Sequence, residues 1–234
     1  FFEKSIDKFN SRLKALVKQF MLVDIKNRHD GNWEQIIFRQ FIQARLFKFK
    51  NKSVICPLLE LVNHEVISLP FITNNDGIST PNYPPLDREL THNYSNKSAI
   101  QRFFLYGFFC KETIVFSFPF CIDLNDNTLK FICRGNDLAN DSIVISRSDF
   151  SITIEGLPIA DSNSPQLPKS YLAEIFNRIG DIEFSNTTLL KIIDFNIKIR
   201  KEILNNIEVK DNNLVIHEFR QLLNYEINLI SSCN

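Results

Sequence analysis

The segment PLLELVNH, residues 57–64, ends a short apolar run over residues 53–62 in two adjacent polar side chains, Asn63 and His64. A short apolar run between polar segments is typical of a buried strand or an extended segment. Asn commonly forms turns, so the pair can simply end the strand and cap it. The pair can also bring two hydrogen-bonding side chains to the end of a buried element. Both interpretations stay open on these residues alone.

Two amphipathic helices are predicted before this run. Apolar residues recur at three- and four-residue spacing over residues 3–20 and again over residues 33–47, which is the pattern of a helix with one apolar face. The polar segment 27–32 contains Gly31 and is predicted to be a loop. Faces of this kind belong more often to a core than to a binding surface.

A loop and a short helix are predicted after the run. Residues 73–88 are rich in Asn, Asp, Gly and Pro, and the prolines discourage a helix there. Residues 97–107 have a helical pattern that ends at Gly107, a residue type that commonly ends helices. Tyr94 precedes this helix and Tyr106 lies at its end; composition alone favours core aromatic side chains for both.

The second half of the chain changes from strands to helices. Alternating or β-branched residues predict short strands, which cover residues 113–118, 128–133, 142–146 and 150–155, with a hairpin turn at 147–149. A Pro- and Ser-rich link is predicted at 158–168, followed by helices at 168–178, 186–206 and 213–230. Helices, then short strands, then a helical tail indicate an α+β fold and not an alternating α/β fold.

The composition excludes several classes of protein. Lys and Arg number 27 and Asp and Glu also number 27, so no excess of basic charge favours generic nucleic-acid binding. Hydrophobic residues make up 44% and charged residues 23%, which are values for a folded globular chain. The 6 glycines form no Gly-x-Gly segment and no Gly-Lys-Ser/Thr segment, so a Gly-rich phosphate loop is not expected.

The cysteines and the charge pattern bear on compartment and membrane. The 5 cysteines form no Cys-x-x-Cys pair, so we expect buried free thiols in a reducing compartment and neither a disulfide framework nor a metal site. Residues 103–122 are rich in apolar side chains, but Lys111, Glu112 and Pro119 interrupt them, which argues against a membrane span. We expect a monomer of the cytoplasm or nucleus.

Taken in order, four segments resemble the SET-domain protein methyltransferases, of the type found in plastid Rubisco large-subunit lysine methyltransferase and actin histidine methyltransferase. Ala44-Arg45 matches an Ala/Ser-Arg pair at the end of a helical insertion. The segment 57–64 matches the form Pro-x-x-Asp-x-x-Asn-His, with Glu60 in place of Asp. Tyr94 with Ser98, and then Tyr106-Gly107-Phe108, match the Tyr, the Ser/Asn-containing helix and the Tyr/Ser-Gly-Phe segment that follow in this family.

The resemblance implies a division of the chain and an activity. Residues 1–50 would be the helical insertion, residues 51–122 the C-terminal part of the SET core, and residues 123–234 strand hairpins followed by a helical substrate-binding domain. The activity would be transfer of a methyl group from S-adenosylmethionine to a lysine side chain of a protein substrate. A histidine acceptor stays an alternative, because the family contains both chemistries.

The resemblance also assigns roles to residues. Tyr94 would be the catalytic phenol at the methyl-transfer point, and Asn63 and His64 would bind the cofactor. Substrate-binding roles would fall to Tyr106, which would line the lysine channel, and to Arg45 and Glu60.

One expected part of the family pattern is missing from these 234 residues. The family opens with strands that carry a Gly-x-Gly segment against S-adenosylmethionine, where glycine lets the backbone approach the ligand closely. No such segment occurs here. The chain therefore either begins inside the helical insertion of a longer protein or is a degenerate relative, and a catalytically inactive SET-like protein-binding module stays an alternative.

Overall fold

The computed structural model is an α+β structure that divides into two compact units. The helix–sheet unit comprises Phe1–Ile25 and Lys97–Asn234, and the hairpin unit comprises Lys26–Asn96. The structure describes residues 10–21, 38, 42, 46–56, 59, 62–65, 68–80, 91–93, 98–106, 109–124, 129–134, 145–179, 186–207 and 214–233. The predicted α+β class is confirmed, and the domain boundaries predicted at 50 and 122 stay predictions.

The described helices of the helix–sheet unit begin and end close to their predicted positions, except that the helix predicted over 3–20 is wrong at its start, because Asn10 is not helical and α2 begins at Ser11. They are α2 (Ser11–Met21), α4 (Ala99–Tyr106), α5 (Leu167–Ile179), α6 (Asn186–Asn205) and α7 (Leu214–Ser232). Asn10 caps α2, because its side-chain oxygen accepts a hydrogen bond from the amide of Leu13 at 2.8 Å. None of the described helices combines the length and the apolar character that a bilayer crossing requires.

The start of α4 carries a capping box. The amide of Gln101 donates to the Ser98 hydroxyl at 3.2 Å, and the amide of Ser98 donates to the Gln101 side chain at 3.3 Å. Two amide groups at the start of the helix are thereby satisfied within the first turn. This local arrangement fixes where the helix begins.

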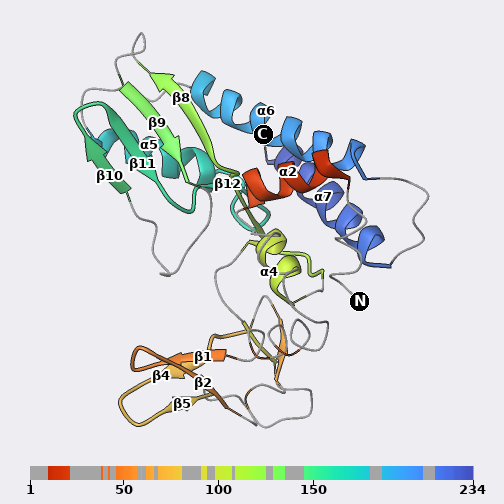
Figure 1. The fold of residues 1–234 in the computed structure, drawn as a ribbon. Coiled ribbons are helices and arrows are strands. Elements are labelled where there is room, and N and C mark those ends of the chain that lie inside the picture. The colour runs from red at the N-terminus through yellow and green to blue at the C-terminus, as the bar shows by residue number, and fades with distance from the viewer. Residues whose placement is uncertain are drawn as a thin grey trace. The chain divides into compact units, whose positions relative to one another are not determined.

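A four-stranded sheet lies in the same unit (Figure 1). Its strand order is β10-β11-β9-β8, in which β9 and β11 are parallel and the other neighbours are antiparallel. The strands are β8 (Phe120–Leu124), β9 (Leu129–Cys133), β10 (Ile145–Ser148) and β11 (Ser151–Ile154). The predicted hairpin is confirmed, but β10 extends over Arg147 and Ser148, which the prediction placed in the turn.

A second pair of strands corrects the prediction of a link at 158–168. β12 (Pro158–Asp161) is a fully buried strand, and it pairs antiparallel with β7 (Ile114–Phe116). Pro158 stands at the first position of β12, where a proline is tolerated in a strand. Helices α5 and α7 pack against β12, and this packing supplies the burial that the local composition does not reveal.

Two apolar cores hold the helix–sheet unit together. One core lies between α2, α4, α6 and α7 and includes the stacked rings of Phe103 and Phe219, whose centroids are 5.4 Å apart. The other joins the sheet and β12 to α5 and α6 through Phe131 and Phe176. Helices α6 and α7 lie side by side and contribute to both cores (Figure 1).

The hairpin unit differs more from its prediction. The helix expected over 33–47 is wrong at its end, because Leu46 and Phe47 open β1 (Leu46–Phe49), which pairs with β2 (Lys52–Ile55). Lys50 and Asn51 have φ values of 46° and 61°, which suit a tight two-residue hairpin turn. The apolar run after Lys52 therefore starts as a mostly exposed hairpin strand and not as a buried one.

The segment predicted as a loop at 73–88 contains a second small hairpin. β4 (Ile72–Thr73) pairs with β5 (Ile78–Ser79). The side-chain oxygen of Asn74 accepts from the amides of Asp76 and Gly77, each at 2.9 Å. These bonds organise the turn between the strands in the way that Asn residues do in Asx-turns.

Candidate functional site

The Asn-His pair forms a short strand of its own. β3 (Asn63–His64) pairs in parallel with β6 (Thr91–His92), so that Asn63 lies opposite Thr91 and His64 lies opposite His92. Asn63 is exposed and His64 is half-buried. Because the strands run in the same direction, Glu65 after β3 and Asn93 after β6 lie at the same end of this two-stranded ladder.

The backbone after β3 holds the segment 91–93 at more than one point. The amide of Glu65 donates to the carbonyl oxygen of His92 at 3.1 Å, and the amide of Asn93 donates to the carbonyl oxygen of Leu69 at 3.4 Å. The turn between these contacts is closed by a hydrogen bond from the Ser68 amide to the Glu65 carbonyl oxygen at 3.2 Å. Glu65 and Leu69 thus bind His92 and Asn93, which precede Tyr94 in the sequence.

Side chains reinforce the same connection. The Thr91 hydroxyl donates to the Glu65 carboxylate at 2.6 Å, and the Ser68 hydroxyl lies 3.1 Å from the same oxygen and 2.6 Å from the Thr91 hydroxyl. Hydrogen bonds to a carboxylate are stronger than those between neutral groups. The Glu65 carboxylate therefore links the end of β3 to β6 and places a negative charge beside the Asn-His pair.

The His92 side chain is buried beneath the strand pair. It is 5% exposed, and its ring centroid lies 3.6 Å from that of Phe71. The pKa of His92 is lowered from 6.5 to about 4, chiefly by burial and to a smaller extent by the charge of His64, while a backbone hydrogen bond at Asn93 opposes the shift. His92 is therefore neutral at pH 7 and acts as a buried aromatic side chain.

The structure describes only part of the predicted site. Asn63 and His64 share one strand, and Tyr106 is the last residue of α4. Arg45, Glu60 and Tyr94 lie outside the described residues, as does the side chain of Tyr106.

Glu65, Thr91 and His92 were not predicted as part of the site, although they hold the strand pair together. Glu65 follows His64 directly and His92 lies two residues before Tyr94. The closeness of these residues to the predicted motifs in the sequence was the only signal that could have pointed to them. The pairing of β3 with β6 cannot be predicted from either segment alone.

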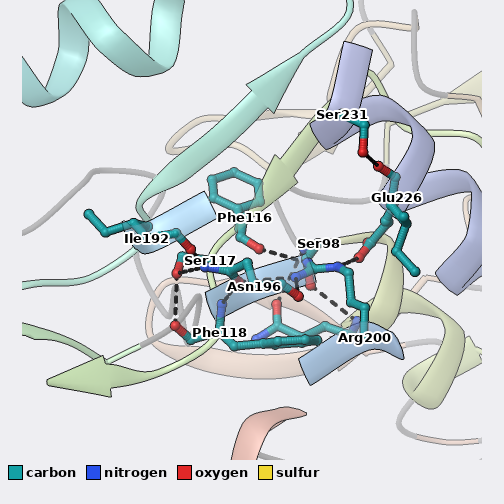
Figure 2. A network of polar contacts seen from close by, with 11 residues as sticks. Ser98, Phe116, Ser117, Phe118, Ile192, Asn196, Arg200, Glu226 and Ser231 are labelled. Atoms are coloured by element: carbon teal, nitrogen blue, oxygen red, sulfur yellow. Dashed lines mark hydrogen bonds and ion pairs between the residues drawn. The ribbon is translucent and has the colours of Figure 1, made fainter. Parts of the chain in front are cut away.

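A buried polar network lies in the helix–sheet unit (Figure 2). Arg200 donates to the Glu226 carboxylate at 2.7 Å, to the Asn196 side chain at 3.0 Å and to the Phe116 carbonyl oxygen at 3.1 Å. The Asn196 side chain accepts from the Phe118 amide at 2.9 Å and donates to the Ser117 hydroxyl at 2.9 Å. These contacts attach the end of β7 and the residues after it to α6 and α7. They also give the buried charges of Arg200 and Glu226 the ion pair and hydrogen bonds without which burial would be costly.

A second buried network connects α4, the segment before β7, and α7. Arg102 forms a buried ion pair with Glu112, and the Cys110 thiol donates to the same carboxylate at 2.9 Å. The Tyr225 hydroxyl donates to the backbone oxygen of Glu112 at 2.6 Å. Burial, followed by the hydrogen bond to Glu112, raises the pKa of the Cys110 thiol to about 12, so this thiol is protonated and unreactive at neutral pH.

The cysteines differ in their surroundings. All are free thiols, of which Cys133 is buried and Cys121 is exposed on β8. The expectation of buried thiols is therefore wrong for Cys121.

Comparison of the chain with protein-family models, with curated proteins and with solved structures finds no match.

Proposed function

We propose that this protein is an S-adenosylmethionine-dependent protein-lysine N-methyltransferase. The observation that carries the proposal is the parallel pairing of β3 with β6, which puts Asn63 and His64 beside Thr91 and His92, a strand that ends two residues before Tyr94 in the sequence. Two segments that are far apart in the sequence are thus neighbours in one strand pair. The α+β class and the helical C-terminal part are compatible with a SET domain followed by a helical substrate-binding domain.

The side chains at this position fit a nucleoside-containing, positively charged methyl donor. Asn63 is exposed and offers both a donor and an acceptor, and the half-buried His64 ring adds a second hydrogen-bonding group. The Glu65 carboxylate lies on the residue after the pair, and His92 is neutral at pH 7. A site with this charge would attract a sulfonium group and would not repel it.

The proposed roles of the chain's residues are binding and orientation. When bound, S-adenosylmethionine would supply an activated methyl group. Asn63 and His64 would hold its polar groups, and Tyr94 would orient the acceptor amine with a phenol that is neutral at pH 7, since an unperturbed Tyr titrates near ~10. Arg45, Glu60 and Tyr106 would contact the substrate.

A binding titration with S-adenosylmethionine tests the cofactor part of the proposal. We expect the full-length wild-type protein to bind, and we expect His64→Ala to weaken binding by about tenfold or more, because a hydrogen bond to a bound polar group contributes roughly 1.5 kcal/mol. His217→Ala is the matched control, because His217 is an exposed residue of α7 in the other unit.

Equal affinity of the wild-type protein and His64→Ala would remove the assigned role of His64. Absence of any binding by the full-length protein would contradict the enzyme and leave the protein-binding module. If transfer occurs, mass spectrometry of the modified residue distinguishes a lysine acceptor from a histidine acceptor.

A further inference from the structure

Three aromatic rings from different segments of the hairpin unit lie in a row. The ring centroid of His92 on β6 is 3.6 Å from that of Phe71, and the Phe71 centroid is 5.4 Å from that of Phe47 on β1. His92 is 5% exposed, so its imidazole has little contact with water. A charged side chain in such a place is stable only where other groups replace the water that it has lost.

The ionisable groups on the neighbouring strand favour a neutral His92. His64 lies directly opposite on β3, and a positive charge on one of two adjacent imidazoles makes a charge on the other less favourable. The carboxylate of Glu65, the next residue along, accepts hydrogen bonds from the hydroxyls of Thr91 and Ser68.

The segment that carries Phe71 provides no charge for His92 either, since residues 69–73 contain no ionisable side chain. The face of an aromatic ring attracts a cation weakly, but the loss of water from a buried cation costs more. The pKa of His92 agrees with this balance, because burial is the largest cause that lowers it from 6.5 to about 4. A proton therefore binds His92 much more readily when the ring is exposed to water.

The backbone of His92 is part of the same strand pair. The amide of Glu65 donates to the carbonyl oxygen of His92 at 3.1 Å, and the amide of Asn93 donates to the carbonyl oxygen of Leu69 at 3.4 Å. β3 and β6 each contain 2 residues. Because the ladder is so short, a movement of His92 that exposes its ring would break these hydrogen bonds together.

We propose that the β3–β6 pair is an acid-sensitive switch, in which protonation of His92 moves its ring away from Phe71, opens the pair and releases Asn63 and His64 from β6. The two states are the closed and the open strand pair within the hairpin unit. A histidine that is buried when neutral and solvated when charged couples the binding of a proton to opening, so opening becomes easier as the pH falls. The switch does not depend on the proposed function; only its effect on the cofactor-binding pair does.

Amide hydrogen exchange, measured residue by residue in the full chain at pH 7 and pH 5, tests the switch. The reporter amides are those of Glu65 and Asn93. After correction for the intrinsic pH dependence of exchange, we expect their opening equilibrium to rise by about twentyfold at pH 5, given a pKa of 6.5 in the open state and about 4 in the closed state. The amides of Lys130 and Arg134, which are hydrogen-bonded in the sheet of the other unit, should change by less than about threefold.

Three variants identify the group that responds to pH. His92→Phe keeps a ring against Phe71 and removes the site of protonation, so the reporter amides should change by less than about threefold between the two pH values. His64→Gln removes only the opposite charge and should keep most of the response, because burial is the larger cause. His217→Gln alters an exposed histidine of the other unit and should respond as wild type does.

An NMR titration of the His92 imidazole in the wild-type protein needs no variant. We expect the ring to titrate near 4, and titration near 6.5 in the folded protein would overturn the switch. The same response of the reporter amides in wild type and His92→Phe would also overturn it, and loss of the whole response in His64→Gln would assign the response to His64. An equal rise at the Lys130 and Arg134 amides would show unfolding of both units and would overturn a switch confined to the hairpin unit.

Discussion

At the scale of single residues, His92 shows how burial decides the behaviour of a titratable side chain. Its folded pKa of about 4 lies below its ordinary value of 6.5 because burial disfavours the charged ring. Between these two values the unfolded chain binds a proton that the folded chain does not. Stability is therefore full above pH 6.5 and is lost as the pH falls toward 4.

We expect the free energy of unfolding to fall by about 2 kcal/mol between pH 7 and pH 5 from this residue alone. His92→Gln should remove that part of the pH dependence, while His217→Gln, at an exposed position, should leave it unchanged. Urea unfolding of the three proteins at both pH values measures it. The same pH dependence in wild type and His92→Gln would show that His92 is not the group that titrates.

The sequence predicted some single residues of the site and missed others, for a physical reason. Asn63 and His64 could be recognised because they stand together at the end of an apolar run. Glu65 and Thr91 could not, because their importance comes from a hydrogen bond across β3 and β6. The buried state of Arg200 depends on partners from α7 and from the last residue of β7, which helical spacing does not reveal.

At the scale of elements, the capping box of α4 makes a local prediction. Ser98→Ala removes the acceptor of the Gln101 amide, and we expect it to lower the free energy of unfolding by about 1 kcal/mol. Ser170→Ala is the control, because Ser170 is an exposed residue inside α5 where Ala is well tolerated. Equal unfolding midpoints for the two variants in urea would contradict the role of the cap.

Helices were predicted more accurately than strands, because the apolar pattern of a helix lies within the helix and the burial of a strand depends on its neighbours. The apolar spacing of α6 and α7 lies within each helix, so their ends agree with prediction within a few residues. β12 looks like a Pro- and Ser-rich link, and its burial comes from β7, α5 and α7. β8 was missed although its burial alternates at Phe120, Ile122 and Leu124, a signal that the interrupting Pro119 and the short length of the strand obscured.

At the scale of the whole molecule, each unit joins segments that are distant in the sequence. In the hairpin unit, the pairing of β3 with β6 joins the Asn-His pair to the segment before Tyr94. In the helix–sheet unit, the Arg102–Glu112 ion pair and the Tyr225 hydroxyl join α4 and the chain before β7 to α7. The α+β class followed from the order of the predicted elements, whereas these pairings between distant segments required the structure.

The most direct measurement of the central claim is transfer of a labelled methyl group from S-adenosylmethionine into protein from a lysate of the source organism. The comparison uses the full-length protein, Tyr94→Phe, and the control Tyr171→Phe, which alters a half-buried tyrosine of α5 in the helix–sheet unit. We expect wild type and Tyr171→Phe to label a lysine side chain, and Tyr94→Phe to lose transfer by about a hundredfold with nearly unchanged S-adenosylmethionine affinity. Turnover retained by Tyr94→Phe, or the absence of labelling by the wild-type protein, would contradict the account.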